Sequence, residues 1–316
     1  MMNYMSHTSK MTGRRLPVVR TLLTLSALFV LSSASAASNF NTAASLDNSA
    51  SLYKPDSTSS VKTTIELPLQ GVTLEYKTNV RLLQVLDDAN ANFNANASSN
   101  ENASGSIGYF PLSAQLFDKT NTESNESNKA IETKKRNVLN QLEAFAVEEP
   151  EANIVRQQLA SFQYLNRVFI ELDRNAVISQ SDKNPLLVSS SNLEKTSATQ
   201  AQTQRFSLYL PQRPTSIQLM GAMKESVTMN LIEHGTLNDY LDALPNDFVG
   251  ESADKSVAYV VQPDGVVQTI QYAYWNEQPV YLAPGAIVFM AFYSLPSEYS
   301  TLNQDIVDLL RHKVGL

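Results

Sequence analysis

The sequence contains no cysteine among its 316 residues, which excludes disulfide bonds, a thiolate nucleophile and a cysteine-ligated metal. Histidine is scarce, and the three histidines lie far apart at positions 7, 234 and 312. A histidine-based triad or a zinc site would need partners that this chain barely provides. The glycine-rich motifs that bind phosphates and dinucleotides are also missing. We therefore expect no catalytic residues, no metal site and no cofactor.

The N-terminal segment has the three parts of a secretory signal peptide. Arg14, Arg15 and Arg20 precede an apolar run, and the run ends in small residues at Ala34-Ser35-Ala36. This order predicts a signal peptide over residues 1–36 with cleavage after Ala36. The apolar run is shorter than the about 20 residues that a membrane span needs, and no later segment is apolar enough to cross a membrane. We expect a soluble periplasmic product with no transmembrane segment after cleavage.

Acidic residues outnumber basic ones, with 31 Asp and Glu against 24 Lys and Arg. Loss of residues 1–36 would remove four basic residues and no acid, which leaves 20 against 31 and a net charge of −11. An acidic chain repels polyanions at long range, so we expect no nucleic-acid partner.

Residues 61–190 are expected to form a first domain. Two short strand-like runs flank Gly71, and a helix with apolar residues at positions 80, 82, 83 and 86 follows. The stretch 87–106, rich in Asn, Ala and Ser, is predicted to be a loop. Residues 128–165 carry apolar residues at helical spacing on both sides of Pro150, which predicts a helical hairpin inserted in this domain.

Composition and pattern set the other boundaries. Residues 37–60 contain few large apolar side chains and are predicted to be disordered. Residues 191–204 are predicted to be a linker. The second domain is expected over 205–296. In it, Thr236 and Asp239 can form a capping box for a helix over 236–244, and the strand 286–292 is apolar without alternation, as in a strand covered on both faces.

The element order of the second domain is strand, strand, helix, strand, strand, and the first domain begins in the same way. A short helix across a small mixed sheet is typical of the β-grasp fold. The sequence therefore predicts an α+β protein of two β-grasp domains, with the helical hairpin in the first and an amphipathic helix over 297–316.

Three residues are candidates for ligand or partner binding. Arg167 stands between the helical hairpin and a strand, where its planar donor could grip a carboxylate or sugar oxygens or form a structural ion pair. Trp275, the only tryptophan, and its neighbour Asn276 end a strand-like segment. A tryptophan there can belong to the core, or its ring can stack on a sugar.

The C-terminal helix carries a narrow apolar stripe made by Leu302, Ile306, Leu309, Leu310 and Val314. Two uses of the stripe stay open at this point. The helix can dock into a groove of another protein, or it can pack onto its own domain.

Several segments resemble the capsule-biosynthesis GfcC-like family of periplasmic proteins over about residues 61 to 316. The resemblance is carried by four segments: "YLPQRPTSIQLMGAM", "AYVVQPDGVVQ", "YAYWNEQPVYLAPGAIVFMAF" and "LNQDIVDLLR". It implies two β-grasp domains similar to those of outer-membrane polysaccharide exporters, and no established catalytic residues. The family's notable arginine corresponds here to Arg167, in "NRVFIELD".

Three functions are open on these grounds. The first is a non-enzymatic periplasmic accessory of capsule or exopolysaccharide biosynthesis and export, which binds an outer-membrane exporter with β-grasp domains, the polysaccharide, or both. The second is a glycan-modifying enzyme that uses a pair of carboxylates. The third is a structural surface protein, favoured only by the Asn- and Ser-rich loops. The carboxylates open to the second hypothesis are Asp173, Asp242, Asp247, Asp254 and Asp264.

Overall fold

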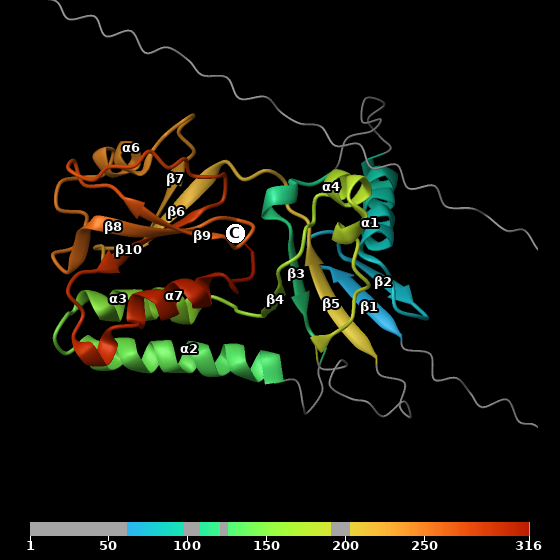
Figure 1. The fold of residues 1–316 in the computed structure, drawn as a ribbon, viewed down its shortest axis with the longest axis horizontal. Coiled ribbons are helices and arrows are strands. Elements are labelled where there is room, and N and C mark those ends of the chain that lie inside the picture. The colour runs from blue at the N-terminus through green and yellow to red at the C-terminus, as the bar shows by residue number, and fades with distance from the viewer. Residues whose placement is uncertain (1–61, 98–107, 121–125, 191–202, 316) are drawn as a thin grey trace, which may run out of the picture. The chain divides into compact units, whose positions relative to one another are not determined.

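The computed structural model describes residues 62–97, 108–120, 126–190 and 203–315, all of which belong to one compact unit. Within these residues the strands form two mixed five-stranded sheets (Figure 1). The predicted α+β class with two sheet domains is therefore confirmed, and the finer β-grasp assignment stays a prediction. The predicted signal peptide and disordered segment lie outside the described residues.

The first sheet has the strand order β2-β1-β5-β3-β4. Its strands β1 and β5 are parallel, and the other neighbours are antiparallel. Helices α1 (Leu82–Ala97) and α4 (Arg174–Ser179) share one core with this sheet. The strands are β1 Thr63–Leu67, β2 Val72–Tyr76, β3 Gln115–Asp118, β4 Asn166–Val168 and β5 Gln204–Tyr209.

Helix α1 extends into the stretch that was expected to be a loop, since it continues to Ala97. Asparagine is a poor helix former, but tertiary contacts anchor the first half of this helix. Asp87 forms an ion pair with Arg174 at 2.6 Å, and Asp88 accepts a hydrogen bond from the Tyr76 hydroxyl at 2.7 Å. Ala89 is buried against the sheet.

The second sheet has the strand order β7-β6-β10-β8-β9. Strand β10 lies in the middle, parallel to β6 and antiparallel to β8. Helix α6 (Leu237–Asp242) begins where Asp239 accepts the backbone N–H of Thr236 at 2.7 Å, as the predicted capping box requires. The strands are β6 Ser216–Gly221, β7 Val227–Asn230, β8 Ala253–Val261, β9 Val267–Gln271 and β10 Ile287–Phe292.

Every residue of β10 is buried, as its unbroken apolar sequence predicts. Its side chains alternate between two cores. Val288 and Met290 join Leu237 and Tyr240 of α6 on one face of the sheet. Phe289 on the other face joins a core built with three helices, namely α2 (Glu126–Phe145), α3 (Glu151–Ser161) and α7 (Leu302–Leu310) (Figure 1).

The helical hairpin α2–α3 is inserted between two strands of the first sheet, but it packs on the second. Its apolar residues share a core with the second sheet: Val138, Leu142, Phe145, Ala152, Val155 and Leu159. The hairpin is therefore inserted in the first domain along the chain, as predicted, while its apolar face covers the second sheet. Sequence order does not tell which of two apolar faces an inserted element will cover.

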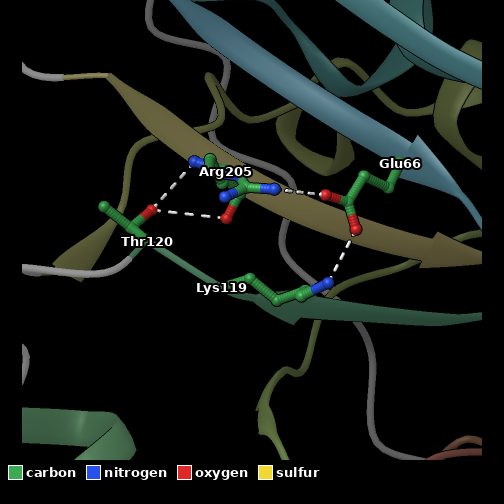
Figure 2. A network of polar contacts seen from close by, with 4 residues as sticks. All are labelled: Glu66, Lys119, Thr120 and Arg205. Atoms are coloured by element: carbon green, nitrogen blue, oxygen red, sulfur yellow. Dashed lines mark hydrogen bonds and ion pairs between the residues drawn. The ribbon is translucent and has the colours of Figure 1, made fainter.

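The second domain was expected to begin at residue 205. This boundary is wrong, because β5 is a strand of the first sheet. Arg205 donates to the Glu66 carboxylate of β1 at 2.7 Å, and Lys119 donates to the same carboxylate at 2.6 Å. Thr120 bonds the backbone of Arg205 (Figure 2). The hydrogen bond from Lys119, and with it the one from Arg205, holds the pKa of Glu66 below its usual value. The chain therefore returns to the first sheet before it enters the second.

Three short 3₁₀ turns complete the described elements: Pro111–Ser113, Ser181–Lys183 and Ser297–Tyr299. Among the described residues, we find no helix whose length and apolar character would let it cross a bilayer.

Candidate functional site

Arg167 lies on the short edge strand β4, opposite Phe117 of β3. Its side chain is buried, with 6% of its surface exposed. In the part of the chain that the structure describes, the guanidinium has no ion-pair partner. It bonds backbone carbonyls instead: Nη2 donates to Pro263 at 2.7 Å and to Ala114 at 3.5 Å, and Nη1 donates to Arg311 at 3.5 Å.

The turn Pro263-Asp264-Gly265, which joins β8 to β9, is held by two arginines. Arg167 binds the carbonyl of Pro263, and Arg311 Nε donates to the carbonyl of Gly265 at 2.8 Å. Gly265 has a φ of +87°, and a Cβ there would come within 2.5 Å of the Phe169 ring. Glycine is therefore required both for the backbone and for the close approach. Through the bond from Arg167, the turn therefore connects the second sheet to the first.

Phe169, two residues after Arg167, is the aromatic centre of this region. The Arg311 guanidinium lies 4.5 Å from its ring centroid and the Arg167 guanidinium 5.5 Å. The ring of His312 meets it edge to face at 5.6 Å. Because arginine stacks well on aromatic rings, Phe169 keeps both guanidinium groups in place.

A groove of about 950 Å³ opens beside Arg167. One part of its wall is apolar and is formed by Phe110, Leu112 and Phe169. Charged side chains also line the groove: Arg167, Glu171, Asp173, Asp182, Lys183 and Asp264. The volume is at the upper end of the about 300–1,000 Å³ that ligand pockets span, and the mixture of apolar surface with a few polar groups is typical of them.

Burial lowers the pKa of Arg167 to about 10, with Asp264 acting against this shift and Arg311 adding to it. The guanidinium therefore remains a cation at neutral pH. A buried cation without a carboxylate partner is costly for a fold, and here it faces a groove. The site can offer a fixed positive charge to a ligand.

His312 supports Arg167 from the C-terminal side. Its Nδ1 accepts the backbone N–H of Arg167 at 3.2 Å, so the ring must be neutral. Burial lowers the pKa of His312 to about 4, which keeps it neutral at ordinary pH.

The other predicted binding residues lie elsewhere. Trp275 does not line the groove and is 65% exposed, so the core alternative for this tryptophan is wrong. Its ring meets that of the exposed Tyr274 edge to face at 4.8 Å. The backbone N–H of Asn276 donates to Ala273. Its side-chain Oδ1 is buried and has no hydrogen-bond partner among the residues that the structure describes.

The structure also decides between the two uses of the terminal helix. Leu302, Ile306, Leu309 and Leu310 are all buried in the core shared with α2, α3 and β10. The alternative in which this stripe docks into another protein is therefore wrong, because the stripe is buried in the protein's own core. The helix ends before Val314, whose backbone N–H donates to Gln163 at 2.9 Å, so the chain after α7 pairs with the segment that leads into β4.

Most of the carboxylates considered for catalysis accept hydrogen bonds from nearby backbone N–H groups. Asp173 caps α4, Asp254 accepts the N–H groups of Ser256 and Val257, and Asp264 accepts that of Val266. Glu171 lines the groove, but the bond from the Asp173 backbone, followed by the bond from Lys183, lowers its pKa. A general acid needs the opposite shift. In the described ranges, no cluster of three or more potential metal ligands is found.

Sequence reasoning missed Phe169, Arg311 and the apolar wall around Phe110. Arg311 stands inside the segment "LNQDIVDLLR" that was quoted for the resemblance, and its presence there was the available signal. Phe169 could have been found from strand alternation, which places it on the same side as Arg167.

The comparison with known families concerns the C-terminal part of the chain. Residues 225–315 match the family described as capsule biosynthesis GfcC C-terminal. Over these residues the chain is similar to that family. The matched region contains the Pro263–Gly265 turn, Trp275 and Arg311. It does not include Arg167, whose correspondence to the family's arginine stays a prediction.

The chain is also similar to the uncharacterized protein YjbG of Escherichia coli strain K12. The two are 27% identical over 164 residues, which is 51% of this chain and 60% of YjbG. The resemblance predicted from the sequence is thus confirmed.

Proposed function

We propose that this protein is a non-catalytic accessory of capsule or exopolysaccharide biosynthesis and export that works in the periplasm and binds polysaccharide in the groove beside Arg167. The observation that carries the proposal is a buried arginine that forms no ion pair with any described residue and lines an open, partly aromatic groove. The similarity of residues 225–315 to a capsule-biosynthesis family supports polysaccharide as the ligand class.

The groove has the two kinds of contact that a sugar needs. Phe110 and Phe169 offer apolar ring surface, against which the C–H face of a sugar ring can pack. Arg167 and Lys183 offer hydrogen-bond donors to hydroxyl or carboxylate oxygens. Arg167 is held by the Pro263 and Ala114 carbonyls, so binding would require little reorganisation of its side chain.

An outer-membrane polysaccharide exporter is the protein partner that we propose. With the terminal helix buried, the exposed pair Tyr274 and Trp275 is a better candidate for its contact. Tyrosine and tryptophan are enriched among residues that dominate binding energy at protein interfaces.

The test is a long side chain placed in the groove, where it would occupy the space that the sugar needs, at a position that leaves the core intact. Leu112 lines the groove and is exposed, and Leu69, on the turn after β1, is exposed but lies outside the groove. Leu112→Arg should abolish binding to the polysaccharide of the producing cell and reduce its export, while the matched Leu69→Arg should change neither. Equal binding by both variants would remove the groove from the proposal.

Partner capture tests the protein contact separately. Trp275→Ala should lose the exporter from a pull-down out of solubilised envelope, and Tyr293→Ala, an equally exposed aromatic, should retain it. Retention by both variants would exclude this contact.

A further inference from the structure

A second hollow of about 270 Å³ is lined by residues that lie before β6, after β7 and before β10 of the second sheet. Tyr281, Ile232 and His234 form part of its wall, and Arg213 borders it. The Tyr281 side chain is 62% exposed, and the ring of His234 meets it edge to face at 6.5 Å. The hollow therefore combines an accessible aromatic ring with a guanidinium, on a smaller scale than the groove.

Phe110 and Arg213 connect the hollow with the groove. Phe110 lines the groove and Arg213 lines the hollow, and the guanidinium of Arg213 lies 5.5 Å from the centroid of the Phe110 ring. Two hydrogen bonds fix this approach. The backbone N–H of Phe110 donates to the Pro211 carbonyl at 2.8 Å, and the side-chain Nε2 of Gln212 donates to the Gly108 carbonyl at 3.1 Å.

We propose that the groove and the hollow are two subsites of one track that holds several consecutive sugars of a polysaccharide. This inference rests on the proposed function and names the ligand as a polymer segment rather than a single sugar or a chain end. Arg167 and Phe169 form the first subsite, the stacked pair Phe110 and Arg213 bridges the two, and Tyr281 forms the far contact.

A track of this kind binds a polysaccharide more tightly than either subsite alone, because one chain contacts both weak sites at once. Once a chain is held in the groove, its next sugars reach the hollow at a high effective concentration, and the second contact adds affinity without a second entropy cost of association. A short fragment can use only one site. Affinity should therefore rise with fragment length until both subsites are filled.

The experiment measures binding to polysaccharide fragments of graded length, prepared by partial hydrolysis of the surface polysaccharide of the producing cell. The wild-type protein is compared with Tyr281→Ala and with Tyr293→Ala, a tyrosine of similar exposure, 67% against 62%, that lies outside both subsites. We expect octasaccharides to bind the wild type at least about tenfold tighter than disaccharides, and Tyr281→Ala to erase that advantage while disaccharide binding stays unchanged. Tyr293→Ala should behave as wild type.

Two results would overturn the track. One is equal affinity of the wild type for short and long fragments. The other is a Tyr281→Ala variant that keeps the length dependence, or that weakens short and long fragments alike. If the wild type binds no fragment of any length, the proposed function itself fails, and this outcome is distinct from the other two.

Discussion

Removal of one buried side chain from α7 tests whether the terminal helix is part of the fold. Leu309 has no exposed surface and lies in the core with α2, α3 and β10. In Leu309→Ala, the lost burial of its methyl and methylene groups costs about 2 kcal/mol. The cavity left behind adds about 1–2 kcal/mol, because a core held by three helices and a sheet relaxes only in part. We expect the free energy of unfolding to fall by about 3–4 kcal/mol in total.

The assay is urea unfolding followed by circular dichroism on the protein without residues 1–36. Gln304→Ala is the matched control, since Gln304 lies on the exposed face of the same helix and bonds only Asp308, at 3.0 Å. It should change the free energy of unfolding by less than about 0.5 kcal/mol. If Leu309→Ala costs no more than this control, the helix is not packed in the free protein and the docking alternative returns.

Three further predictions concern the site and its surroundings. Gly265→Ala should lower the free energy of unfolding by about 2–3 kcal/mol, more than the about 1 kcal/mol of Gly71→Ala, because both glycines have positive φ but only Gly265 faces a side chain within 4 Å; equal costs in urea unfolding would remove the Phe169 contact from the account. Stability should fall as the pH drops from about 6.5, where histidine titrates in an unfolded chain, to about 4, the folded pKa of His312, because only the unfolded state binds the proton in that window. The loss should be about 2 kcal/mol after allowance for solvent screening, and His312→Gln should remove it; an unchanged pH profile in that variant would contradict the assignment. Trp275, the only tryptophan, should emit near the wavelength of free tryptophan and be quenched by iodide, because its ring is exposed; blue-shifted emission protected from iodide would place it in the core instead.

Local patterns predicted the elements of the second sheet well. The unbroken apolar run 286–292 contains the central strand β10, and the capping residues Thr236 and Asp239 mark the start of α6. Both signals depend only on neighbours in sequence: burial on both faces removes the alternation of a strand, and a cap acts within one helical turn. The α+β class could therefore be read from the chain.

Long-range choices were beyond the reach of the sequence. The apolar faces of α2 and α3 fit either sheet by composition, and only the three-dimensional packing shows that they cover the second. Strand β5 was assigned to the wrong domain because Arg205 follows a polar stretch, although its partner Glu66 lies far back in the chain. Trp275 was weighed as a core residue on residue type alone, and its exposure depends on where the loop after β9 leaves the sheet.

The site was predicted in part. Arg167 was found because it stands between a helix and a strand, but its partners are backbone carbonyls of residues distant in sequence. Carbonyl acceptors carry no signature in the sequence, so the bonds of Arg167 to the Pro263–Gly265 turn and to Ala114 could not be foreseen.

The most direct test of the central claim is the affinity of the purified protein for the surface polysaccharide of the producing cell, measured by isothermal titration for wild type, Leu112→Arg and Leu69→Arg. We predict binding by the wild type and by Leu69→Arg, and its loss in Leu112→Arg with folding unchanged. Undiminished binding by Leu112→Arg would contradict the assignment of the groove beside Arg167 as the polysaccharide site.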